Sequence, residues 1–166
     1  MAFGTGQHAT TQLCLEALES LSGQNARGAL LDVGTGSGIL AIAAQKLGFA
    51  PIDACDIDPD AMLALKENCG LNQTSGITTW HGSLEPTLAD KQHCYRVIVA
   101  NILFPVLEEL LPQLARLRHP QGVLLLSGIL SEQKAAMRAL CQQQGLHVLT
   151  EFDREDWACL IVGVKK

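Results

Sequence analysis

The stretch at residues 29–38 reads Ala-Leu-Leu-Asp-Val-Gly-Thr-Gly-Ser-Gly, and it decides the fold of this chain. The apolar run before the first glycine predicts a buried parallel strand, and the apolar run at 39–47 predicts a helix. A strand, a glycine turn and a helix N-terminus bring backbone N–H groups and unhindered backbone to one point. This arrangement suits a nucleotide-like ligand lying over the turn.

The spacing of the three glycines narrows the choice of ligand. A dinucleotide fingerprint needs glycines in the order G-x-G-x-x-G, whereas here Gly38 comes one residue early and Ile39 occupies the required position. An acidic residue, Asp32, followed by G-x-G-x-G resembles the first motif of S-adenosylmethionine-dependent methyltransferases of the Rossmann-like class. The alternative is an ordinary tight turn between a strand and a helix.

Composition predicts one folded domain over residues 1–166, because 48% of the residues are hydrophobic and 17% are charged. The net charge of −5 argues against direct binding of nucleic acid, which needs a basic surface, and leaves room for a basic protein substrate. No run of apolar residues is long enough for a membrane span. The six cysteines are scattered without a C-x-x-C pair, so we expect neither a metal site nor disulfides, and a reducing cytoplasm fits.

Strands alternate with helices along the chain until a final hairpin. We expect strands near residues 29–33, 50–55, 77–80, 95–100, 123–126, 147–152 and 157–164, and helices near 9–21, 39–47, 59–69, 104–117 and 131–144. This order predicts an α/β fold, a doubly wound, mostly parallel seven-stranded sheet with an antiparallel C-terminal hairpin.

Three local features refine these helices. Thr10 or Thr11 is expected to cap the first helix and Ser131 the last one, since hydroxyl side chains accept from the free N–H groups of a first turn. Pro112 is expected to kink or divide the helix at 104–117. The segment 84–94 is predicted to be a polar loop.

Polar residues follow the predicted parallel strands where ligands bind in such sheets, outside the carboxyl ends. They are Asp32, Asp56, Asn101 and Ser127. Asp56 comes 22 residues after Gly34, a distance that places its carboxylate beside the glycine turn to accept from a ribose diol. Capping of the next helix is the alternative for Asp56 and Asp58; we assign it to Asp58 alone.

Taken together, these blocks resemble one family, the lysine methyltransferases of the eleventh protein of the large ribosomal subunit. The resemblance covers nearly the whole chain in the order 2–11, 32–40, 56–59, 99–102, 127–129 and Trp157. It implies transfer of methyl groups from S-adenosylmethionine to lysine or N-terminal amines of that ribosomal protein. It also implies a monomer in the cytoplasm.

By resemblance, the cofactor is contacted by Thr11, Gly34, Gly36, Asp56 and Asn101. Residues Phe3, Thr5 and Gly6 would belong to a loop that closes over it, Trp157 would form a wall of the amine pocket, and Ser83 is a weak candidate near the adenine.

Asn101 is the expected catalytic residue, because its amide oxygen suits the orientation of an amine N–H. Its alternative role is to cap the helix that begins near Phe104. No residue stands out as a general base; His8 is the nearest by position, although a solvated loop histidine fits it better.

Other functions stay open at this point. A related methyltransferase for another protein or a small-molecule amine is the first alternative, and an idle cofactor-binding module is the second. Methyltransferases of side-chain amides carry Asn-Pro-Pro-Tyr where this chain has Asn101-Ile102-Leu103-Phe104, which disfavours them. We also expect that Met1 was added and that an N-terminal substrate-recognition domain precedes the equivalent segment in the family.

Overall fold

The protein is described by a computed structural model that covers residues 6–24, 27–85 and 87–165. The strands are β1 (Leu30–Val33), β2 (Ile52–Asp56), β3 (Ile77–His81), β4 (Tyr95–Asn101), β5 (Arg118–Leu130), β6 (His147–Arg154) and β7 (Trp157–Gly163). The helices are α1 (Ala9–Gly23), α2 (Ile39–Lys46), α3 (Pro59–Leu71), α4 (Phe104–Leu117), a short 3₁₀ turn η1 (Ser131–Gln133) and α5 (Lys134–Gln143).

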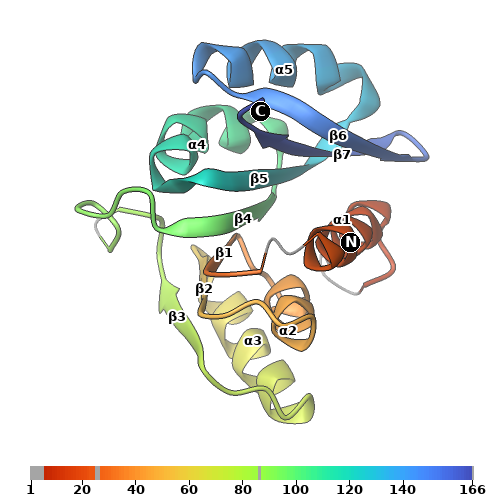
Figure 1. Cartoon of the computed structure of the whole chain (residues 1–166). Coiled ribbons are helices and arrows are strands. Elements are labelled where there is room, and N and C mark those ends of the chain that lie inside the picture. The colour runs from red at the N-terminus through yellow and green to blue at the C-terminus, as the bar shows by residue number, and fades with distance from the viewer. Residues whose placement is uncertain (1–5, 25–26, 86, 166) are drawn as a thin grey trace.

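The strands form one sheet in the order β3-β2-β1-β4-β5-β7-β6. The first five neighbours in this order run parallel, and β7 lies antiparallel to both β5 and β6. Helices α1, α2 and α3 cover one face, and α4 and α5 cover the other (Figure 1). The predicted doubly wound sheet with an antiparallel C-terminal hairpin is confirmed.

Two hydrophobic cores, one on each face, hold these layers together. Side chains alternate between the faces of a strand, so neighbouring residues of β4 enter different cores. Val97 and Val99 pack under α1 and α2, whereas Ile98 and Ala100 pack under α4. Because both faces are buried, the central strands read as continuous apolar runs, and this made them recognisable in the sequence.

Three expectations about element boundaries are wrong. The strand expected at 123–126 is longer, because β5 begins at Arg118. Ser131 does not cap a helix; it opens η1, and the Gln133 side chain accepts from the Leu130 N–H at 2.8 Å. Pro112 does not divide α4, which runs without a break from Phe104 to Leu117 with Pro112 on its exposed side; a kink at Pro112 stays a prediction.

The predicted polar loop between β3 and β4 also contributes to the core. Leu84 and Leu88 are 0% and 4% exposed and pack on the α4 face of the sheet. Two apolar residues in an otherwise polar segment thus extend the core that α4 forms with the sheet.

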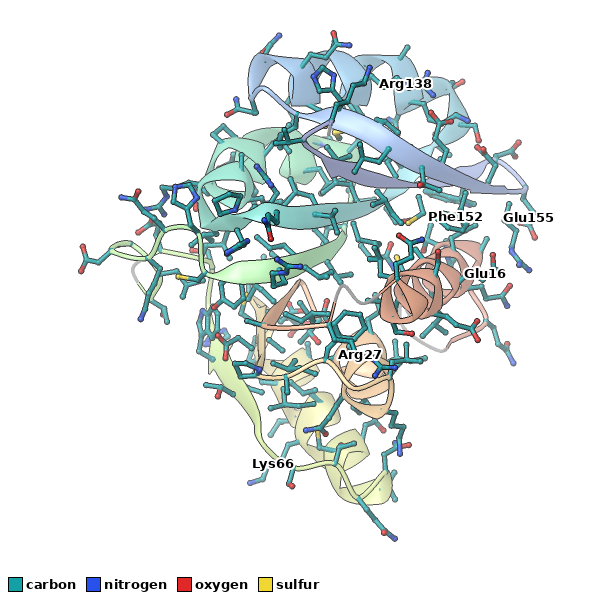
Figure 2. All side chains as sticks on the ribbon, in the orientation of Figure 1. Glu16, Arg27, Lys66, Arg138, Phe152 and Glu155 are labelled. Atoms are coloured by element: carbon teal, nitrogen blue, oxygen red, sulfur yellow. The ribbon has the colours of Figure 1, made fainter. Side chains whose placement is uncertain are left out.

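Helix α1 is tied to the β6–β7 hairpin at the opposite end of the chain. The Arg154 guanidinium donates to Gln12 at 2.8 Å and forms an ion pair with Glu16. Figure 2 shows Glu16 and Phe152 where α1 meets this hairpin, and Phe152 packs against the α1 core. The contact places the first turn of α1 near Trp157, the first residue of β7.

Candidate functional site

A cavity of about 870 Å³ opens at the carboxyl ends of the parallel strands. This volume lies in the range of small-molecule sites in proteins. Four of the predicted site residues line it: Gly34, Gly36, Asp56 and Asn101. Trp157 forms part of the same wall. The sheet therefore brings together groups that lie on four different segments of the chain.

The glycine turn between β1 and α2 forms the floor of the cavity, and it needs two of its glycines for different reasons. Gly34 adopts a φ of +69°, and a Cβ built there would lie 2.5 Å from the Ile102 side chain. Gly36 adopts a φ of +55°, and a Cβ there would meet no atom within 4 Å. Gly34 thus allows two strand ends to approach, whereas Gly36 leaves open space for a ligand.

Asp56 joins the end of β2 to this turn. Its Oδ2 atom accepts from the Gly36 N–H at 2.8 Å, and its Oδ1 atom accepts from the Asp58 N–H at 3.0 Å. Asp58, as expected, is the N-cap of α3 and accepts from the Asp60 N–H at 2.9 Å. The Asp56 carboxylate is thus held in the wall of the cavity, and a carboxylate oxygen accepts more than one hydrogen bond.

Asp32 lies beneath the turn and braces it. The side chain is 1% exposed, and the Thr35 hydroxyl donates to its Oδ2 atom at 2.7 Å. Burial raises the pKa of Asp32 to about 6, although hydrogen bonds from Thr35 and the Ala41 N–H oppose that rise. The acidic residue that precedes the glycines in the sequence thus supports the turn from below and does not reach the cavity wall.

Asn101 ends β4 and lies half-buried in the wall. It pairs in register with Ser127 of β5, which is fully buried below the cavity and donates to the Ala158 carbonyl. Helix α4 has Leu103 as its N-cap, with no side-chain capping bond. The alternative role of Asn101 as the cap of this helix is therefore excluded.

A β-bulge at Gly128 shapes the wall beside Asn101. The register between β5 and β7 shifts between Ser127 and Ile129, and Gly128 adopts a φ of +80°. A Cβ at this position would lie 2.4 Å from the Ile102 carbonyl oxygen. In the sequence, Gly128 stood out only as part of the block 127–129; the close approach of the Ile102 backbone explains why a glycine is needed there.

The first turn of α1 differs from the prediction. His8, and neither Thr10 nor Thr11, is the N-cap, and its Nδ1 atom accepts from the Thr10 N–H at 3.3 Å. Thr11 is 3% exposed in the first turn of α1 and is not among the described residues that line the cavity. The His8 ring also contacts Trp157, with 5.2 Å between ring centroids and an interplanar angle of 66°.

The remaining expected site residues fall in different places. Ser83 lines the cavity at the end of β3, and its hydroxyl donates to the Glu85 carbonyl. Gly6 has a φ of +76°, and a Cβ there would lie 3.0 Å from Ile39. Phe3 and Thr5, expected in a closing loop, lie outside the described residues.

Sequence reasoning missed an apolar rim at the mouth of the cavity. Ile57 is 75% exposed and Leu103 is 55% exposed, and both line the cavity with Val106. The sequence signal that could have revealed this rim is the presence of apolar residues directly after Asp56 and near Asn101, where polar loop residues would be expected. In the wall below, burial raises the pKa of the Cys55 thiol to about 12, so this group stays protonated.

The part of the chain that the structure describes contains neither a candidate metal site nor a candidate membrane-spanning helix. No three His, Cys, Asp or Glu side chains gather there in a way that could hold a metal ion. No helix among those residues is both long and apolar enough to cross a membrane. All six cysteines are free thiols.

Known proteins match the chain over its full length. Residues 1–166 match the family described as Ribosomal protein L11 methyltransferase (PrmA). The ribosomal protein L11 methyltransferases of Trichlorobacter lovleyi and Geobacter metallireducens are 44% and 46% identical to it. These matches cover 96% and 97% of this chain, respectively, but 53% and 51% of the relatives.

A solved structure agrees with the same fold. The ribosomal protein L11 methylase of Lactobacillus delbrueckii subsp. bulgaricus superposes with a TM-score of 0.87 at 36% identity. The superposition covers 100% of this chain and 82% of that one. The chain spans about half the length of the curated relatives it matches.

Proposed function

The chain belongs to the family of ribosomal protein L11 methyltransferases, and from this membership we propose that it methylates amines of ribosomal protein L11 with S-adenosylmethionine as methyl donor. One observation carries the proposal. A single cavity has a carboxylate, Asp56, beside the open glycine turn, and an amide, Asn101, with an indole, Trp157, elsewhere in its wall. These are the groups needed to hold a nucleoside and to orient an amine.

The residues present fit the cofactor. The open space above Gly36 admits a ligand close to the backbone, and its volume suits a nucleoside with an amino-acid tail. The Asp56 carboxylate is held by two backbone N–H groups and has further lone pairs for the hydroxyls of a ribose. The exposed Ile57 side chain adds apolar surface next to it.

When bound, the cofactor would supply an electrophilic methyl group to the amine nitrogen; the electron pair of the broken carbon–sulfur bond would stay on sulfur, and the nitrogen would give up a proton to water. The protein must present the amine uncharged and in line. A free lysine is almost entirely protonated at neutral pH, since its pKa is about 10.4. The largely apolar wall disfavours the ammonium form and so favours the neutral amine.

Asn101 orients the amine in this proposal. Its side-chain oxygen accepts an N–H, which directs the nitrogen lone pair toward the methyl carbon. Since the residue ends a strand buried on both faces and does not cap α4, its position is rigid and its side chain is free for this task. Holding two reactants in such a geometry lowers the barrier by several kcal/mol.

We propose further that the protein works as a monomer in the cytoplasm and does not bind nucleic acid directly. The net charge of −5 supports attraction of a basic ribosomal protein over a nucleic acid. The six free thiols support a reducing compartment.

Mass spectrometry tests the proposed function directly. The purified chain is incubated with S-adenosylmethionine and unmodified ribosomal protein L11, and the intact mass of the substrate is followed. We expect methyl groups on amines of that protein. Methylation of other amines alone would show a different substrate, and cofactor binding without any transfer would show an idle binding module.

A further inference from the structure

We propose that His8 is a positioning residue for methyl transfer, holding the Trp157 indole as the wall of the amine end of the cavity. The proposal rests on the proposed function. It starts from a contact between residues at opposite ends of the chain: the two rings lie 5.2 Å apart in an edge-to-face arrangement. Aromatic rings prefer this geometry, because the positive edge of one meets the negative face of the other.

Strand register places Trp157 on the same side of the sheet as Asn101. Asn101 pairs with Ser127, and Ser127 pairs with Cys159. Paired residues point to the same face, and Trp157 lies two positions from Cys159 in β7, which returns it to that face. Asn101 and Trp157 therefore both lie on the α1 side of the sheet, and both line the cavity.

The indole lies where the strand ends. Trp157 is the first residue of β7, after a turn in which Glu155 has a φ of +55°. Its side chain is half-buried and packs against the α1 core at its inner edge. A half-buried ring at the start of a strand has fewer neighbours to fix its rotamer than a core residue has.

His8 approaches the indole from α1 and is itself firmly held. Its Nδ1 atom accepts from the Thr10 N–H at 3.3 Å and lies 2.8 Å from the Thr10 hydroxyl oxygen. Thr10 is 1% exposed, so the imidazole is anchored to a buried residue. The ion pair between Arg154 and Glu16 fixes α1 to the hairpin that carries Trp157. The firmly held His8 ring thus contacts the less constrained Trp157 ring.

This arrangement predicts that loss of the His8 ring lowers the rate of methyl transfer but leaves cofactor affinity unchanged. Loosening the indole misplaces the amine relative to the methyl carbon, and small misplacements lower the rate strongly. The carboxylate of Asp56 and the open space above Gly36 belong to other elements, β2 and the β1–α2 turn. Cofactor affinity is therefore expected to survive the loss of the His8 ring.

The test compares H8N with a matched control, H119N. Asparagine at position 8 still caps α1, because its side-chain oxygen accepts the same N–H, but it cannot form the ring contact. His119 has the same local bond, its Nδ1 atom accepting from the Gln121 N–H at 3.1 Å, near the opposite end of the sheet. Both variants are made in a Trp80→Phe background, which leaves Trp157 as the single tryptophan.

Three quantities are measured on each variant: quenching of the indole emission by acrylamide, affinity for S-adenosylhomocysteine, and kcat and KM for ribosomal protein L11. For H8N we expect the quenching constant to rise at least about 2-fold and kcat to fall roughly 3- to 10-fold, as for the loss of one aromatic pair. The dissociation constant of S-adenosylhomocysteine should stay within about 2-fold. The H119N variant should match the parent in all three.

A His8→Phe variant separates the ring from the cap. It keeps an aromatic edge against the indole but loses the bond to the Thr10 N–H, so we expect low quenching and near-parental kcat with a lower melting temperature. A quenching constant and kcat for H8N equal to those of H119N would overturn the proposal. If the parent chain transfers no methyl group, the proposed function fails instead, and the quenching constant still decides whether His8 holds the indole.

Discussion

Replacing Asn101 with alanine is expected to separate chemistry from stability. The residue is half-buried, ends β4 and makes no capping bond to α4, whose N-cap is Leu103. The loss of stability should therefore stay below about 1 kcal/mol, the usual effect of removing a cap. For a chain of 166 residues this corresponds to a fall in melting temperature of less than about 4 °C.

The methyl-transfer step should respond much more strongly. If Asn101 orients the amine, its loss should slow transfer at least about 100-fold, which corresponds to about 2.7 kcal/mol of transition-state stabilisation. The assay is a single-turnover experiment with saturating cofactor, combined with thermal melts and binding of S-adenosylhomocysteine. Single-turnover conditions exclude product release from the measured rate.

Ser127→Ala is the matched control for this experiment. Ser127 lies opposite Asn101 in the sheet but is fully buried, and its hydroxyl donates to the Ala158 carbonyl at 3.0 Å. Its removal should lower stability by about 1 kcal/mol and change the transfer rate by less than about 3-fold. An Asn101→Ala variant that melts like this control and transfers methyl groups at the parental rate would refute the role of Asn101.

Three further perturbations test other parts of the site. Asp56→Ala should raise the dissociation constant of S-adenosylhomocysteine about 10- to 100-fold by calorimetry, because a charge-assisted contact worth roughly 1.5–3 kcal/mol is lost; unchanged affinity would remove the carboxylate from the site. Asp32 has a pKa raised from 3.8 to about 6 in the folded protein, so its contribution to stability is fully present below pH 3.8 and is lost as the pH rises through 6. Denaturation of Asp32→Asn should therefore lack a pH-dependent loss of roughly 3 kcal/mol across this range, and an unaltered pH profile would contradict the buried charge. Gly38→Ala and Gly36→Ala both strain a backbone of positive φ, but only Gly38→Ala also places a Cβ 2.0 Å from the Leu65 side chain, so it should destabilise the fold by about 1–3 kcal/mol more, whereas Gly36→Ala should in addition weaken cofactor binding; equal effects of the two on melting temperature would argue against this assignment.

The sequence predicted some parts of the site better than others. Asp56 and Gly36 follow strands whose apolar runs are unmistakable, and parallel strands end at one edge, so their meeting at 2.8 Å could be expected. Thr11, expected at the cofactor by resemblance, is buried in the first turn of α1 and is not among the described residues that line the cavity, so its cofactor contact stays a prediction. The position of a helix N-terminus depends on how the helix docks, and no local pattern reveals that.

The cap of α1 also shows that local sequence patterns do not predict how a helix docks. Two adjacent threonines are the better caps by propensity, yet His8 caps the helix and both hydroxyl residues are buried. With Thr10 and Thr11 buried, the helix starts at Ala9, two or three residues earlier than a cap at either threonine would place it. Tertiary packing therefore outweighed a local preference worth about 1 kcal/mol.

By itself, the sequence determined the order of strands and helices, the glycine turn and the carboxylate at the end of β2. These features depend on hydrophobic periodicity and on short-range backbone geometry, which neighbouring residues encode. Only the tertiary structure decided the bulge at Gly128, the His8–Trp157 contact and the position of Asn101 away from any cap. The bulge and the ring contact depend on groups more than twenty residues apart meeting in space, and sheet register and helix docking set those distances after the local elements have formed.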